Sequence, residues 1–298
     1  MRRARPHRRL FGGAMSGAGF FESFALWRDA VAAAAISGAA LGFLGVWVVL
    51  KRMVYVPLAL TQVSSAGVIA AFLLHDVLDA ALGEHPAVEG FCDPAWFSLL
   101  FSLGAAAVFA RARRESVNGV AVAYLVSAAA VLLLGGFVRQ DLHDISGVLF
   151  GSAVLVETRQ VFYLLAAGLL VALVHAFQYR RFLFVSFDPD AAGAAGLGRF
   201  FHEALLIGSM ALMLSVATRA IGALPAFGFS ILPALGALRL ARSMRTAFVL
   251  AAVAGVAAAA GGYYLSFVLE LPTGASMVLL CALLSLALAL AGRRAAED

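Results

Sequence analysis

The chain has 298 residues, of which 63% are hydrophobic and only 13% are charged, whereas a soluble domain is about half apolar and about a quarter charged. A water-soluble surface cannot be built from this composition, and continuous apolar runs of about 20 residues favour membrane-spanning helices over the short alternating segments of a β-barrel. The net charge of +5 does not indicate a nucleic-acid partner, because basic residues in such a chain more often set membrane orientation. We therefore predict an all-α fold, a polytopic transmembrane helix bundle.

The first 28 residues do not form a clean apolar segment, because glycines and charged residues such as Glu22, Arg28 and Asp29 interrupt the stretch after the basic start. We interpret residues 1–28 as an amino-terminal tail that includes an interfacial stretch around residues 20–27, and residues 29–298 as the transmembrane domain.

Apolar segments then recur to the end of the chain, and we predict about eight to nine spans. Lys51 and Arg52 begin a series of basic clusters that stand at alternate ends of these segments, while acidic residues and histidines occupy the opposite loops. By the positive-inside rule the basic ends are cytoplasmic, so we expect a multi-pass protein of the bacterial inner (plasma) membrane. The predicted segments are 30–50, 54–75, 94–110, 116–138, 160–179, 200–218, 220–238, 246–269 and 271–292.

The second apolar segment carries a polar cluster, Thr61, Gln62, Ser64 and Ser65. Such a cluster can line a polar translocation pathway, or it can serve interhelical hydrogen bonds, which Ser, Thr and Gln commonly make in membranes. Both interpretations stay open. Glycines four residues apart, Gly38 and Gly42, predict close helix packing in the first segment.

Acidic and histidine residues of the outer loops are the candidate metal ligands, because carboxylates and imidazoles suit hard or borderline cations. His143 and Asp144 stand in the loop that follows the fourth segment, and residues 144–152 could form a short re-entrant or interfacial helix. Solvated loop charge is the alternative.

A segment of different character lies between the basic residues Arg181 and Arg199. Asp188 as cap, Pro189 at the first turn and Asp190 near the helix start predict a short cytoplasmic helix that ends at Gly196. This helix could dock on a soluble partner or be a capped loop. Residues 200–238 come next, and their prolines and glycines favour either discontinuous helices or two ordinary helices with a turn near Arg219.

The chain does not carry its own ATPase site. A phosphate-binding loop ends in Gly-Lys-Ser/Thr, and the only lysine, Lys51, lies between Leu50 and Arg52. His202 and Glu203 begin an HExxH pattern, but Leu206 breaks it. We therefore expect no enzyme activity and no covalently bound cofactor.

Several short motifs in order resemble the membrane permease of the ABC-type zinc, manganese and iron importer family. The resemblance covers roughly residues 30–290 and implies alternating access driven by a separate cytoplasmic ABC ATPase, an extracytoplasmic substrate-binding protein, and a paired permease, which we expect to be a homodimer. It also implies that Asp188, Pro189, Asp190, Ala192 and Gly196 couple the chain to the ATPase, and that a divalent transition metal is transported. The matching motifs are residues 51–55, 144–151 with Leu149-Phe150-Gly151, 188–192 with Gly196, 221–223, 231–234 and 272–276.

One departure from the family concerns the cargo. Relatives that import metal carry an Asp and a His four residues apart in the second helix, and the matching positions here are Leu58 and Gln62. Leu58 cannot bind a metal, and an amide oxygen is a weak zinc ligand. A permease of the same family with a non-metal cargo is one alternative, and a secondary transporter without an ATPase is another.

Overall fold

The computed structural model describes residues 24–82, 90–111, 117–137 and 156–297, and over these ranges the regular structure is helical. Nine helical segments among the described residues are long and apolar enough to cross a membrane, which confirms the predicted helix bundle of about eight to nine spans. The helices are α2 (Phe24–Leu50), α3 (Tyr55–Leu82), α5 (Pro94–Arg111), α6 (Val117–Gly135), α8 (Thr158–Phe187), α9 (Pro189–Ala194), α10 (Arg199–Ile221), α11 (Ala223–Phe229), α12 (Leu232–Leu240), α13 (Met244–Leu269) and α14 (Thr273–Glu297).

The first span begins earlier than the apolar run suggests. Helix α2 starts at Phe24, so Arg28 and Asp29 lie in its first turns and the predicted interfacial stretch overlaps the helix. The division at residue 28 stays a prediction, because residues 1–23 lie outside the described part of the chain.

Helix α2 forms the centre of the bundle and packs most extensively against α13. A Cβ atom added at Gly38 would overlap the backbone of Gly255, and one at Gly42 would overlap the backbone of Ala251. Missing side chains therefore allow the two helices to touch along their backbones, as predicted for Gly38 and Gly42. Toward the other end of α2, fully buried Trp47 packs against rings that include Phe182 and Phe248.

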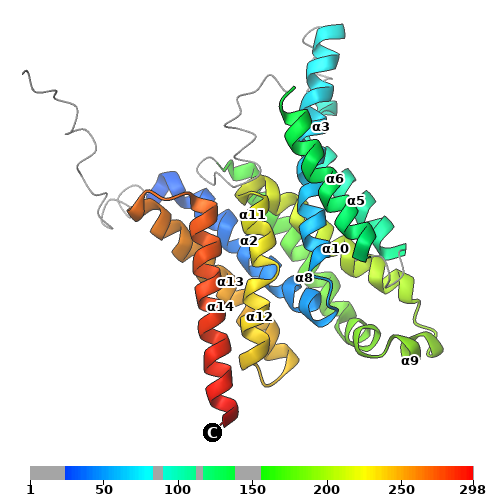
Figure 1. The fold of residues 1–298 in the computed structure, drawn as a ribbon, viewed down its shortest axis with the longest axis vertical. Helices are drawn as coiled ribbons and strands as arrows, with labels where there is room; N and C mark the ends of the chain where they lie inside the picture. The colour runs from blue at the N-terminus through cyan, green and yellow to red at the C-terminus, as the bar shows by residue number, and fades with distance from the viewer. Residues whose placement is uncertain (1–23, 83–89, 112–116, 138–155, 298) are drawn as a thin grey trace, which may run out of the picture.

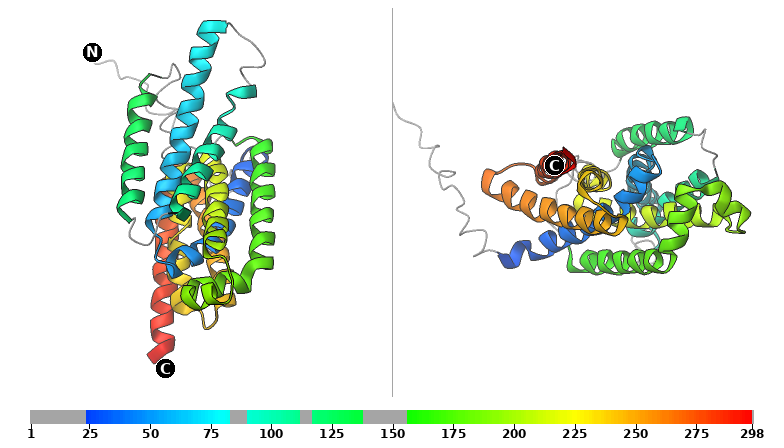
Figure 2. Two further views of the ribbon diagram at one scale, coloured as in Figure 1. Left: turned by 90° about the vertical axis from the view of Figure 1, so that its right-hand side faces the viewer. Right: turned by 90° about the horizontal axis from the view of Figure 1, so that it is seen from below.

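The other helices surround this pair. Helices α3, α5 and α10 pack together, α6 packs on α3, and α8 contacts α2 and α10. Both views in Figure 2 place α6 and α8 on opposite sides of the bundle. Helix α9, the loop between α12 and α13, and the carboxyl terminus lie at one end (Figure 1), and the basic residues at the ends of α12, α13 and α14 lie there too.

The span that includes residues 223–240 is discontinuous. Helix α10 ends at Ile221 and is followed by Gly222, whose φ is 90°, so the break comes three residues after Arg219. Helices α11 and α12 are separated at Ser230 and Ile231, and Pro233 lies in the first turn of α12. Proline lacks the N–H that a continuous helix needs at this point. At the break, the Phe227 carbonyl accepts two hydrogen bonds from Ser230, one from its N–H at 3.1 Å and one from its hydroxyl at 2.7 Å.

Both cysteines, Cys92 and Cys281, are buried free thiols. At Cys92, between α3 and α5, burial raises the pKa of the thiol and the nearby charge of Asp79 adds to the effect.

Candidate functional site

Helix α9 begins as its sequence predicts. The Asp188 carboxylate accepts a hydrogen bond from the Ala191 N–H at 2.9 Å, and Pro189 occupies the first helical turn. This side-chain cap satisfies one of the N–H groups that a helix start leaves open. Asp190 lies in the same turn, where a negative charge is favourable near the positive end of the helix dipole.

The helix ends two residues before the predicted position, and Gly196 closes it from outside. The Leu197 N–H donates to the Ala192 carbonyl and the Gly196 N–H to the Gly193 carbonyl, both at 3.0 Å. Gly196 has a φ of +78°, and a Cβ added there would meet no atom within 4 Å. This bond pattern is a Schellman motif, so glycine is needed here for its backbone conformation and not for lack of space.

The structure brings the five predicted coupling residues together in one exposed unit. Helix α9 lies outside the spans, contacts α8 and α10, and occupies a corner of the bundle (Figure 1). Ala192 is fully buried and anchors the unit, while Asp188, Asp190 and Gly196 are exposed. The arrangement presents a short capped helix, held on two long ones, to the surrounding solution.

The polar cluster of α3 points mainly into the protein. Thr61, Ser64 and Ser65 are fully buried, and Gln62 is half-buried. The Thr61 hydroxyl donates to the Leu58 carbonyl at 2.9 Å, and the Ser65 hydroxyl donates to the Thr61 carbonyl at 3.1 Å. Both hydroxyls therefore bond within α3 itself, whereas the buried Ser64 oxygen has no hydrogen-bond partner among the described residues.

Leu58 and Gln62 lie one helical turn apart, and both are half-buried. Residues three, four and seven apart lie near one face of a helix, so this pair lies beside Thr61 and Ser65 and differs from them in being less deeply buried. Of the four predicted pathway residues, Gln62 is thus the one that reaches toward the surface of the isolated chain.

Within the described ranges, no group of three or more His, Cys, Asp or Glu side chains is placed to hold a metal ion. His143 and Asp144, and the predicted helix over residues 144–152, lie outside these ranges. At the far end of α3, His75 Nδ1 is 3.3 Å from Asp79 Oδ2, and these two residues are four apart on one helix.

One ion pair near α9 was not predicted. Lys51 at the end of α2 reaches Glu203 in the first turns of α10, with Nζ and Oε1 3.4 Å apart. Their side chains are only 11% and 21% exposed, so solvent screens this pair less than a surface pair. The sequence does place both residues at predicted cytoplasmic ends of spans, which is a signal for a possible ion pair. It does not show that they meet, because they are 152 positions apart.

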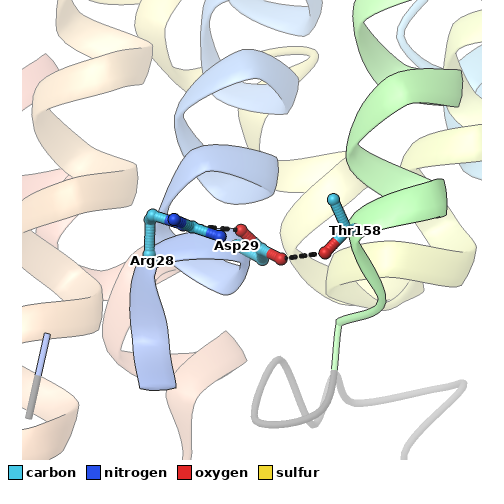
Figure 3. Close-up of polar contacts among 3 residues, drawn as sticks. All are labelled: Arg28, Asp29 and Thr158. Carbon is cyan, nitrogen blue, oxygen red and sulfur yellow. Dashed lines mark hydrogen bonds and ion pairs between the residues drawn. The ribbon is translucent and has the colours of Figure 1, made fainter. Parts of the chain in front are cut away.

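A second unpredicted contact joins α2 and α8 at the opposite end. The Thr158 hydroxyl donates to the Asp29 carboxylate, and Arg28 Nε donates to the same carboxylate at 3.1 Å (Figure 3). The contact fixes the start of α8 to the start of α2.

The chain is similar to a family of known transport proteins. The model described as the ABC 3 transport family matches residues 23–291. The manganese transport system membrane protein MntC of Listeria innocua is 25% identical over 244 residues, which cover 82% of each chain. The chelated iron transport system membrane protein YfeD of Yersinia pestis is 26% identical over 266 residues, which cover 88% of this chain and 84% of that one.

The manganese import system permease protein ScaB of Streptococcus gordonii is 24% identical and covers 88% of this chain and 90% of its own length. Among solved structures, PsaBC from Streptococcus pneumoniae in complex with Fab superposes with a TM-score of 0.76 at 21% identity, covering 93% of this chain and 95% of that chain. This last similarity concerns the fold.

Proposed function

Because the chain belongs to the ABC 3 transport family, we propose that it is the permease subunit of an ABC importer that moves a divalent transition metal into the cytoplasm. The observation that carries this proposal is α9, a short helix capped at both ends and exposed beyond the spans. A chain with no phosphate-binding loop needs an external source of energy, and α9 offers a surface to which a separate ATPase can bind.

We propose that Asp188, Pro189, Asp190, Ala192 and Gly196 couple the chain to that ATPase. Helix α9 contacts both α8 and α10, so a force on α9 acts on the ends of two spans at once. The Lys51–Glu203 ion pair extends the path from α10 to α2. Movement of these helix ends would open the pathway alternately to the two faces of the membrane.

Manganese or iron is the cargo that we propose, since the similar proteins MntC and ScaB are named for manganese and YfeD for chelated iron. The half-buried Gln62 offers an amide oxygen, and oxygen ligands suit Mn²⁺ better than they suit Zn²⁺. We assign Thr61, Gln62, Ser64 and Ser65 to the pathway and His143 and Asp144 to the metal's outer entrance.

A non-metal cargo remains the second candidate, and the observation that favours it is Leu58, which stands half-buried beside Gln62 where a metal ligand would be expected. Uptake of radiolabelled manganese and iron by cells that lack other importers separates the two candidates. The metal proposal expects uptake that requires this chain. An assembled complex that binds ATPase but takes up neither metal would contradict it and favour the second candidate.

The proposed assembly contains a homodimer of this chain, a cytoplasmic ABC ATPase and an extracytoplasmic binding protein. Co-purification tests this assembly directly. The chain should elute together with an ATPase, and the complex should contain two copies of the chain. A chain that transports its cargo with no ATPase bound would overturn the importer proposal.

Replacing Gly196 tests the coupling role of α9. Gly196→Ala forces a residue with a Cβ into a left-handed conformation that costs about 1–2 kcal/mol, so we expect ATPase association to weaken by about tenfold while membrane insertion stays intact. Gly193→Ala is the matched control, because Gly193 lies in the same helix, also has open space around it and has no positive φ. Equal binding by both variants would contradict the role of this helix end.

A further inference from the structure

An open apolar groove lies on the outside of the bundle, where α2, α8 and α13 meet. Its volume is about 720 Å³, within the range of roughly 300–1,000 Å³ that is usual for small-molecule sites. The hollow exists because small residues face one another there: Ala39 and Ala40 on α2, and Gly168, Ala172 and Ala176 on α8.

The groove follows the axis of α8. Its wall extends from Leu165 to Tyr179, which is about 21 Å at 1.5 Å per residue. One leaflet of the hydrocarbon core is about 15 Å thick, half of the bilayer value. Measured from the basic end of the bundle, the groove therefore extends past the middle of the membrane. Leu169, which forms part of its wall, is 62% exposed, and Phe177, beside the groove, is 85% exposed.

The end of the groove near Tyr179 is positively charged. Arg245 forms part of the wall there and is exposed, and Arg180 follows Tyr179 directly. Neither α8 nor α13 contains an acidic residue. Arg245 also lies in the first turn of α13, whose helix dipole presents its positive end to an anion.

We propose that the groove binds an anionic phospholipid of the cytoplasmic leaflet, with one acyl chain along α8 and the phosphate at Arg245. An apolar channel of leaflet length that ends in an arginine fits both parts of such a lipid. A second copy of the chain fits this place less well. A twofold interface along this groove would bring the two arginine-containing ends together on one side of the membrane, where like charges repel.

Native mass spectrometry of the full-length chain tests the proposal, after reconstitution in nanodiscs of equal parts phosphatidylglycerol and phosphatidylcholine. We expect the wild-type chain to retain phosphatidylglycerol preferentially. Arg245→Gln should lower this retention by about fivefold, the usual effect of one arginine at an anionic surface. Ala172→Trp should abolish it by filling the groove.

Two matched variants serve as controls. Arg293→Gln removes a basic residue at the end of α14, and Ala129→Trp adds the same indole to the exposed face of α6 on the opposite side of the bundle. Both should retain the lipid as the wild type does. Equal loss in Arg245→Gln and Arg293→Gln, or undiminished lipid in Ala172→Trp, would overturn the proposal. Loss of the dimer in Ala172→Trp with lipid retention unchanged would instead assign the groove to a second copy.

Discussion

Helices α2 and α8 are both long, strongly apolar and sufficient to cross a membrane, yet they occupy opposite surroundings. Trp47 on α2 is fully buried, whereas Phe177 on α8 is 85% exposed. The difference lies in what their glycines meet. Gly38 on α2 faces the backbone of α13, while Gly168 on α8 faces only side-chain atoms of Ile36 and Ala40, at 3.9 and 4.0 Å from an added Cβ. Apolarity thus decides that a helix enters the membrane, and small residues aligned with a partner backbone decide which helix becomes the core.

The largest expected effect comes from truncating the ring toward the end of α2. Trp47→Ala removes contacts with Tyr179, Phe182 and Phe248 and should destabilise the protein by about 3 kcal/mol, the lower end of the range for buried aromatic residues. The matched change Phe177→Ala on α8 should alter stability by less than about 0.5 kcal/mol. Thermal unfolding in mild detergent measures both, and similar effects of the two changes would break the contrast between the helices.

A smaller effect should result from adding one methyl group at the α2–α13 contact. Gly255→Ala places a Cβ against the Gly38 backbone, and such overpacking costs about 1–3 kcal/mol. Gly168→Ala places the same methyl group in ordinary contact distance and should stabilise α8 by up to about 1 kcal/mol, because alanine favours helix. Thermal unfolding without denaturant can rank the two variants. A thiol-reactive dye reports the temperature at which buried Cys281 becomes exposed. The changes in stability should have opposite signs, and an equal loss of stability in both variants would contradict the prediction.

The smallest effect concerns the inward face of α8. His175 is buried among aromatic rings, and its Nδ1 has no hydrogen-bond partner among the described residues. His175→Phe removes that unsatisfied nitrogen together with the 3.3 Å contact between His175 Nε2 and the Ser209 hydroxyl, while Ser209 still donates to the Leu206 carbonyl at 2.8 Å. Stability should stay the same or rise by up to about 1 kcal/mol.

His202→Phe is the control for this change. Each imidazole has one nitrogen with no hydrogen-bond partner among the described residues, but His202 would lose a 2.9 Å contact with the Gly198 carbonyl, which is shorter than the 3.3 Å contact that His175 makes with Ser209. The same detergent unfolding assay should give a lower stability for His202→Phe than for His175→Phe. The reverse order would mean that the His175 ring has a polar role in the bundle.

Much of this architecture was predictable because it depends on local patterns. The apolar runs gave the spans to within a few residues at most ends, and Asp188, Pro189 and Gly196 gave α9, since caps and turn glycines act over four or five neighbouring positions. The sequence showed that the α3 cluster is polar. It could not show that the Thr61 and Ser65 hydroxyls bond to carbonyls of their own helix, because composition does not distinguish such bonds from the lining of a pathway.

The rest depends on contacts between distant segments. Gly38 and Gly42 predict that α2 packs closely against another helix, but nothing in the apolar runs identifies α13 as the partner or shows that α8 lies at the periphery. The Lys51–Glu203 pair and the Asp29–Thr158 contact join residues on different helices, and only the three-dimensional arrangement brings these residues together. The start of α2 at Phe24 was also missed, because charges at 28 and 29 interrupt the apolar pattern without ending the helix.

The two closed ends of α9 have a consequence for recognition. A free helix of six residues is marginal in water, but Asp188 fixes one end of α9 and the bond from Leu197 to Ala192 fixes the other. A protein that binds here contacts a helix that is already ordered, so little conformational entropy of α9 is lost on binding. The free energy of the encounter is then available to displace the attached spans.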